Sequence, residues 1–225
     1  MRRRTMIAAG LAVAATGRAR AAETPVVLEL FTSQGCSSCP PADALLGELS
    51  RQPNVIALAF HVDYWNRLGW PDPFASRAWT GRQRLYARAL GTEVYTPALV
   101  VNGTAMVVGS HRQAVAQAMR EAAELTLDLS LRRGAVGLQA RIGGELPADA
   151  ELSLAAIDVE QVTKVGAGEN GGRVLREFRI VRTLHVLDAS GPLDRLPAVP
   201  GHQAAVLLAR DARGRVIGAA AVDPV

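Results

Sequence analysis

Residues 26–49 read VVLELFTSQGCSSCPPADALLGEL, which predicts a strand, a loop, a cysteine pair and a helix in that order. Residues 26–31 are a short apolar strand, interrupted by Glu29. Residues 36–49 place leucines at helical spacing. The two prolines after the second cysteine suit a first helical turn, where a missing N–H costs least, and they can delay the regular helix until just after that cysteine.

The cysteine pair is the chemically distinctive feature of this segment. Cys36 and Cys39 are the two cysteines of the chain, and residues three apart share a helix face, so their sulfurs can meet. A disulfide across so short a loop removes little unfolded-state entropy, which favours a reactive or ligand role over a stabilising one. A helix N-terminus stabilises a thiolate. We therefore expect Cys36 to be the exposed, low-pKa nucleophile and Cys39 the buried resolving thiol.

The first 21 residues resemble a signal peptide. Three arginines precede an uncharged apolar run, and Ala19-Arg20-Ala21 is an A-x-A-like cleavage site. Residues 3–7 also loosely fit a twin-arginine pattern. We predict a periplasmic or secreted mature chain that begins near Ala22 and keeps no stable membrane insertion, because the apolar run is too short to span a bilayer.

Composition narrows the classes of partner. The full chain of 225 residues has a net charge of +4, but residues 1–21 hold five arginines and no acidic residue. The rest of the chain has 20 basic and 21 acidic residues, a net charge of −1. Nothing in this balance favours nucleic-acid or anionic-membrane binding. The chain lacks a four-cysteine zinc pattern, and Pro40 follows Cys39 where haem attachment needs histidine, so no cofactor is predicted.

Beyond residue 49, the pattern predicts an α+β protein. Residues 55–62 are a buried strand, and residues 63–91 are an insertion that carries all three tryptophans. We expect Trp65 and Trp70 near the cysteine pair as substrate contacts; the alternative is a tryptophan-rich packing cluster. Thr96-Pro97 then precedes two strands joined by an Asn-Gly turn, and a helix follows from Ser110 to about Leu125.

The pattern of apolar and polar residues changes at residue 126. Alternating apolar and polar residues, with loops rich in glycine, proline and aspartate, predict an antiparallel β region over residues 126–225, folded as a small sandwich. The expected organisation is a signal peptide at 1–21, an α/β domain at 22–125 and a β-rich domain at 126–225.

The order of the predicted elements resembles the thioredoxin superfamily. In that family a cis-proline loop faces the C-x-x-C, and the residue before the proline pairs its backbone with the substrate. Thr96-Pro97 matches this position, so the resemblance implies a cis bond there and a substrate-binding role for both residues.

Several blocks further resemble an exported bacterial family, domain-of-unknown-function family 1223. They are Leu28 to Asp43, His61 to Trp65, Leu68 to Trp70, Asp72 to Phe74, Tyr95 to Pro97, Val100 to Gly103, and Gly168 to Arg173 with Val181-Arg182. This resemblance implies a thioredoxin-like fold with a β extension, but no substrate. No tryptophan precedes Cys36 and Pro40-Pro41 replaces the usual basic continuation, which argues against general thioredoxin-type reductase activity.

Four further residues are candidates. Glu29, buried in its strand, would have a raised pKa and could relay the proton of Cys39; the alternatives are an exposed strand edge or a salt bridge. His61, at a strand end, could be an acid/base or a third metal ligand, or simply structural. Glu169 and Asn170 could contact the cysteine-bearing face or hold a cation, but ordinary loop chemistry is the favoured interpretation.

Three functions follow from these features. The leading hypothesis is a periplasmic thiol–disulfide oxidoreductase that acts on protein thiols or disulfides through Cys36. A copper-handling protein, with Cu(I) on two thiolates and His61, is the first alternative. A non-enzymatic binding module with a passive disulfide is the second.

Overall fold

The computed structural model describes residues 24–135, 137–194 and 196–224, and the predicted signal peptide lies outside them. Within these ranges one eight-stranded sheet has the order β10-β9-β7-β8-β2-β1-β3-β4, and β5 and β6 form a separate pair. The strands are β1 (Val26–Thr32), β2 (Val55–His61), β3 (Ala98–Val101), β4 (Ala105–Val108), β5 (Asp128–Gly134), β6 (Gly137–Gly143), β7 (Glu151–Lys164), β8 (Val174–Val186), β9 (Ala204–Arg210) and β10 (Val216–Val222). The α-helices of this part of the chain are α1 (Pro40–Leu49), α2 (Arg77–Leu90) and α3 (Arg112–Arg120).

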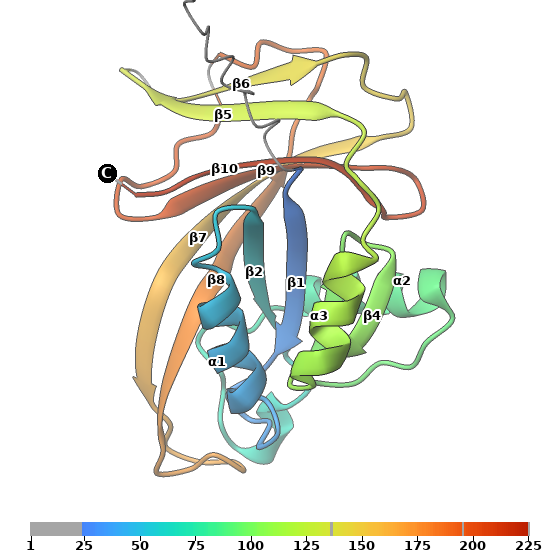
Figure 1. The fold of residues 1–225 in the computed structure, drawn as a ribbon. Helices are drawn as coiled ribbons and strands as arrows, with labels where there is room; N and C mark the ends of the chain where they lie inside the picture. The colour runs from blue at the N-terminus through green and yellow to red at the C-terminus, as the bar shows by residue number, and fades with distance from the viewer. Residues whose placement is uncertain (1–23, 136, 195, 225) are drawn as a thin grey trace, which may run out of the picture.

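Strands β1 to β4 form one half of the sheet, as the sequence predicts. β1 pairs with β2 in parallel and with β3 antiparallel, and β3 returns into β4 through the Asn102-Gly103 turn. Both turn residues have positive φ, 46° and 69°, as a tight hairpin requires. Helices α1 and α3 cover one face of this half (Figure 1), with leucines of α1 packed on β1 and β3.

The predicted insertion forms the cover of the opposite face. A short 3-10 helix (Asn66–Leu68) precedes α2, which is capped by the Ser76 hydroxyl and ends at Gly91 with φ 65°. Trp79 and Tyr86 of α2 are buried against β1 and β2. Of the three tryptophans, Trp79 thus belongs to the core.

The second half of the chain does not fold apart from the first. A separate small sandwich was expected for residues 126–225, but β7 to β10 continue the same sheet, joined to it where Ile180 of β8 pairs with Ala59 of β2. β2 is buried along its whole length, and pairing its free edge with β8 satisfies backbone groups that water cannot reach.

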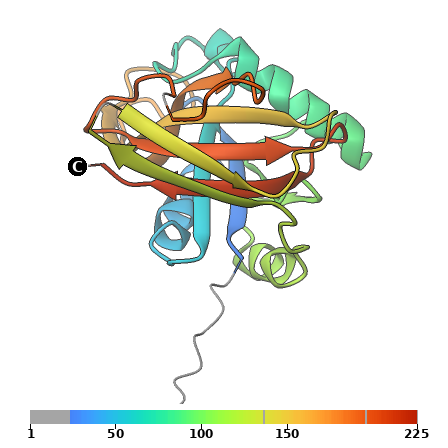
Figure 2. The same ribbon diagram turned by 90° about the horizontal axis from the view of Figure 1, so that it is seen from above.

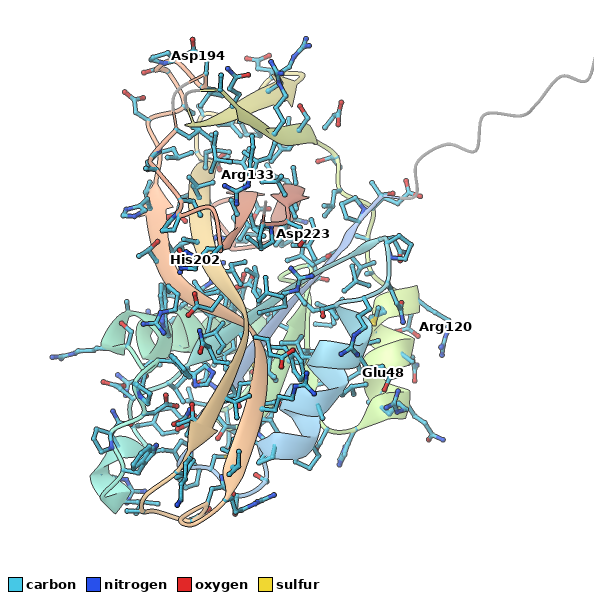
Figure 3. The ribbon with its side chains drawn as sticks, turned by 90° about the vertical axis from the view of Figure 1, so that its left-hand side faces the viewer. Glu48, Arg120, Arg133, Asp194, His202 and Asp223 are labelled. Atoms are coloured by element: carbon cyan, nitrogen blue, oxygen red, sulfur yellow. A yellow bond between two sulfur atoms is a disulfide. The ribbon has the colours of Figure 1, made fainter. Side chains whose placement is uncertain are left out.

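The β5–β6 pair supplies the two-layered part that the alternation predicted. It lies across β9 and β10 (Figures 1 and 2) and buries leucines of β5, β6, β7 and β9 between the layers. Figure 3 shows Arg133 of β5 beside Asp223, where Arg133 Nε donates to the Asp223 carbonyl at 3.2 Å. No helix of the described residues is long and apolar enough to cross a membrane.

Candidate functional site

The cysteine pair lies where β1 has ended and α1 begins. Cys36 and Cys39 form a disulfide with a Cα–Cα distance of 5.4 Å, and Cys39 is the N-cap of α1. Pro40 and Pro41 occupy the first helical positions, so the helix begins just after the pair, as predicted.

Both cysteines are fully buried, and the expectation of an exposed Cys36 is wrong for this disulfide-bonded form. Cys36 and Cys39 each have 0% exposure, while Ser37 and Ser38 between them are exposed. The two cysteine side chains are covered by residues distant in sequence, although the serines between them are not. Three segments provide the cover: the tryptophan-rich insertion, the Thr96-Pro97 loop and the turn between β7 and β8.

Thr96, Pro97 and Trp65 lie at the Cys36 side of the pair. The Thr96–Pro97 peptide bond is cis, as the thioredoxin resemblance implies. The Thr96 hydroxyl donates to Cys36 Sγ at 3.3 Å and accepts from Trp65 Nε1 at 2.8 Å. A chain of two hydrogen bonds therefore connects the insertion, the cis-proline loop and Cys36.

Trp70 contacts the loop before the pair rather than the sulfurs. Its Nε1 donates to Gln34 Oε1 at 2.8 Å, and Gln34 Nε2 donates to Glu177 Oε2 of β8 at 2.7 Å. Gln34 is itself fully buried. The two tryptophans predicted to lie near the pair are thus both there, Trp65 against Thr96 and Trp70 against Gln34.

The turn between β7 and β8 contacts the cysteine loop, although the sequence analysis favoured no such role for it. Asn170 Nδ2 donates to the carbonyls of Gln34 and Cys36, at 3.0 and 2.9 Å. Glu169 Oε2 accepts from the Ser37 N–H at 3.0 Å and from its hydroxyl at 2.7 Å. Ordinary loop chemistry was the favoured interpretation of these two residues, yet they bind the segment that carries the cysteines.

His61, the last residue of β2, lies in a buried acidic cluster. Its Nδ1 is 2.8 Å from Asp72 Oδ2, and its Nε2 is 3.9 Å from Glu177 Oε1. Burial lowers the pKa of His61, but the carboxylates of Asp72, Glu177 and Asp43 outweigh it and raise that pKa to about 9. His61 is therefore charged at neutral pH, with carboxylates facing both ring nitrogens.

Asp43 is a buried acid that the sequence analysis did not single out. It is 4% exposed, and burial raises the pKa of its carboxyl to about 7, with Glu177 acting in the same sense and His61 against it. Its N–H donates to the Cys39 carbonyl at 3.1 Å. The available signal was its position four residues after Cys39, which places both side chains on one helix face.

Glu29 is held in a salt bridge, the alternative considered for it. Arg82 Nε of α2 lies 2.6 Å from Glu29 Oε2, and the Tyr86 hydroxyl donates to Oε1 at 2.6 Å. Burial would raise the pKa of Glu29, but the Arg82 guanidinium and the two hydrogen bonds hold it below its usual range. The predicted raised pKa is wrong, because the sequence cannot show which side chain faces a buried acid.

Among the described residues, no group of three or more His, Cys, Asp or Glu side chains is arranged to hold a metal ion. The Oε2 atom of Glu169, for which cation binding was one of the interpretations, binds Ser37.

Comparison with known proteins places the chain in a family. The family model described as a protein of unknown function, DUF1223, matches residues 27–207. The chain belongs to the DUF1223 family. The crystal structure of protein AGR_C_4864 from Agrobacterium tumefaciens is similar to this DUF1223 chain, with a TM-score of 0.76 and 31% identity over 90% of this chain and 96% of that chain.

A second solved structure is similar in fold alone. HBP35 of Porphyromonas gingivalis has a TM-score of 0.54 and 13% identity, over 90% of this chain and 76% of that chain. None of the curated proteins matches the DUF1223 chain. The blocks that resemble the family in sequence meet in space here: those holding Trp65, Trp70, Thr96 and Asn170 all reach the Cys36 loop through the contacts above.

Proposed function

We propose that this DUF1223 protein is a periplasmic thiol–disulfide oxidoreductase-like protein that exchanges disulfides with protein thiols through Cys36. The observation that carries the proposal is the asymmetry of the pair. Cys36 Sγ accepts a hydrogen bond from Thr96 of the cis-proline loop, whereas Cys39 stands at the N-cap position of α1 and its side chain makes no capping hydrogen bond. The sulfur next to a hydroxyl donor is the one suited to enter a mixed disulfide, and the inner one to leave.

A thioredoxin-like first half is part of this proposal. The order β1-α1-β2-α2-β3-β4-α3, with the C-x-x-C before α1 and a cis-proline before β3, supports it. The periplasmic location rests on the sequence of residues 1–21.

The exchange is balanced as follows. A client thiolate attacks Cys36 Sγ, the Cys36–Cys39 bond breaks, and Cys39 leaves as a thiolate that takes up a proton. A second client thiolate then attacks the client sulfur of the mixed disulfide and releases the Cys36 thiolate. The client dithiol is oxidised by two electrons and the cysteine pair is reduced; the reverse sequence reduces a client disulfide.

Asp43 and His61 would handle the proton of Cys39. Asp43 shares a helix face with Cys39, and its carboxyl, with a pKa of about 7, can gain or lose a proton near neutral pH. Burial raises that pKa, and the charge of His61 acts against burial while the carboxylates of Glu177 and Asp72 act with it. Glu29 has no part in this step, because Arg82 and Tyr86 hold it ionised.

Burial of the pair favours a second candidate, a non-enzymatic binding module with a passive disulfide. At 0% exposure, neither sulfur meets a client unless the covering segments move. The copper-handling alternative gains no comparable observation, because carboxylates face both nitrogens of His61.

Cysteine variants of the full chain separate the two candidates. With a reduced dithiol peptide as client, the oxidised wild type should form the peptide disulfide, Cys36→Ser should not, and Cys39→Ser should accumulate a mixed disulfide with an oxidised peptide. Exchange that persists in Cys36→Ser, or a wild type that does not exchange, would overturn the proposal. The second outcome supports the passive module.

A further inference from the structure

The turn between β7 and β8 contacts the cysteine loop and is held in shape by its own backbone hydrogen bonds. Residues 165–173 close the hairpin, with backbone hydrogen bonds from Val165 N to Arg173 O and from Gly172 N to Val165 O, at 2.9 and 2.8 Å. In Figure 1 this turn lies at the same end of the molecule as the start of α1. Residues more than 130 positions apart in sequence thereby come into contact.

Two buried contacts fix the turn in place. Asn170, fully buried, holds the carbonyls of Gln34 and Cys36, and its own oxygen accepts from Arg173 Nη1 at 2.6 Å. Further along β8, Glu177 holds the side chain of Gln34. The position of the turn therefore does not depend on its exposed residue, Glu169.

Glu169 brings a negative charge to the segment between the cysteines. Its carboxylate accepts both the N–H and the hydroxyl of Ser37. Ser37 is the chain neighbour of Cys36, and it precedes the N-cap of α1, Cys39. The Glu169 carboxylate therefore places a negative charge close to Cys36, where it repels a thiolate.

On the basis of the exchange function proposed above, we propose that Glu169 is a redox-tuning residue. By placing its carboxylate on Ser37, next to Cys36, it disfavours the Cys36 thiolate and keeps the pair disulfide-bonded or protonated. Withdrawal of Glu169 from Ser37 activates Cys36 as a nucleophile.

The other groups near Cys36 are the same in the protein with Glu169 and in a Glu169→Gln variant. The hydrogen-bond partners of Cys36, which are Thr96, Ser38 and Asn170, are uncharged. Among the charged residues, Arg173 binds Asn170, and Asp72 and Glu177 bind Gln34. The Asp43 N–H binds the Cys39 carbonyl, and His61 lies beside Asp72. All of these remain when Glu169 is replaced by glutamine, so a difference between the two proteins reports the carboxylate of Glu169.

The test is the ionisation of Cys36 in a Cys39→Ser background, where one thiol titrates. Thiolate absorbance at 240 nm and the rate of iodoacetamide alkylation are followed against pH, with and without Glu169→Gln. We expect Glu169→Gln to lower the Cys36 pKa by about half a unit, so that alkylation below that pKa is about threefold faster. A pKa and rate that are unchanged, or shifted the other way, would overturn the inference.

Asp188 provides a matched control. It is an exposed carboxylate that accepts from the N–H and the hydroxyl of Ser190, at 3.0 and 2.6 Å, just as Glu169 does from Ser37. Asp188 follows the far end of β8, so Asp188→Asn should leave the Cys36 pKa and alkylation rate unchanged. An equal shift in both variants would also refute the inference.

The outcome is distinguishable from failure of the proposed function. Alkylation and absorbance report the Cys36 thiolate whether or not the wild type exchanges disulfides with a client peptide. A wild type without exchange removes the proposed function; a Glu169→Gln variant without altered ionisation removes the tuning role.

Discussion

Replacement of Glu29 by alanine tests the buried network that ties α2 to β1. The carboxylate and its partner Arg82 have side-chain exposures of 1% and 5%, and their atoms lie 2.6 Å apart. Removing one partner of a buried ion pair leaves an uncompensated charge and costs about 3–5 kcal/mol. The Tyr86 hydroxyl also loses its acceptor, which costs about 1 kcal/mol more. We expect Glu29→Ala to lower the free energy of unfolding by about 4 kcal/mol or more.

Urea unfolding at pH 7, followed by tryptophan fluorescence and circular dichroism, measures this loss. The double variant Glu29→Ala/Arg82→Met should regain part of it, because the unpaired guanidinium is gone. The pair Glu48–Arg112 is the control: its atoms are also 2.6 Å apart, but its side chains are 54% and 62% exposed. Figure 3 labels Glu48 on α1. Glu48→Ala should leave the unfolding curve unchanged within error.

The same interaction has a defined pH dependence. Because Arg82 and the hydrogen bonds lower the pKa of folded Glu29, its stabilisation is present above the unfolded pKa of about 4.3 and is lost as the pH falls through the folded value. A Glu29→Ala variant as stable at pH 7 as Glu48→Ala would refute the reasoning. So would a difference between wild type and Glu29→Ala that persists undiminished at acid pH.

Two other predictions concern stability. The pKa of His61 is raised to about 9 in the folded protein, so its stabilisation is complete below the unfolded pKa of about 6.5 and is lost as the pH rises through 9. Urea unfolding from pH 6 to 9.5 should show this loss in the wild type and not in His61→Gln; equal slopes would contradict it. A Cβ on Gly47 would lie 2.3 Å from the Phe178 ring, so Gly47→Ala should destabilise by about 1–3 kcal/mol despite the better helix propensity of alanine. A Cβ on Gly81 in α2 would meet nothing within 4 Å, and Gly81→Ala should stabilise by up to about 1 kcal/mol; thermal unfolding that ranks the two variants the other way would show the packing argument to be wrong.

Local patterns explain why much of the fold was predictable. The Asn102-Gly103 turn needs two residues that tolerate positive φ, and the sequence supplies them between apolar runs. The prolines at positions 40 and 41 mark the start of α1 for the same kind of local reason. The extent of α3 was less predictable: a helix was expected over about residues 110–125, and the structure has Arg112–Arg120.

The candidate site was predictable only in part. The thioredoxin resemblance implied that Thr96 faces the cysteine pair, and Trp65 was expected nearby as part of its insertion; the structure brings these residues into contact. Glu29 was misjudged because Arg82, its partner, lies 53 residues away. Whether the pKa of a buried carboxyl such as Glu29 is raised or lowered depends on which side chain faces it. The tertiary structure decides which side chain that is.

The sequence by itself determined the strand–disulfide–helix unit, the hairpin of β3 and β4, and the family, because each depends on neighbours in the chain or on whole blocks of residues. Only the tertiary structure decided that β7 to β10 extend the first sheet, and that Glu169 and Asn170 bind the cysteine loop. The alternating residues of β7 to β10 and the turn residues between them predict strands and loops. They do not predict which strand edge each strand pairs with. One of the three segments that cover Cys36 follows from that pairing, since the long β7–β8 hairpin carries its turn to the start of α1.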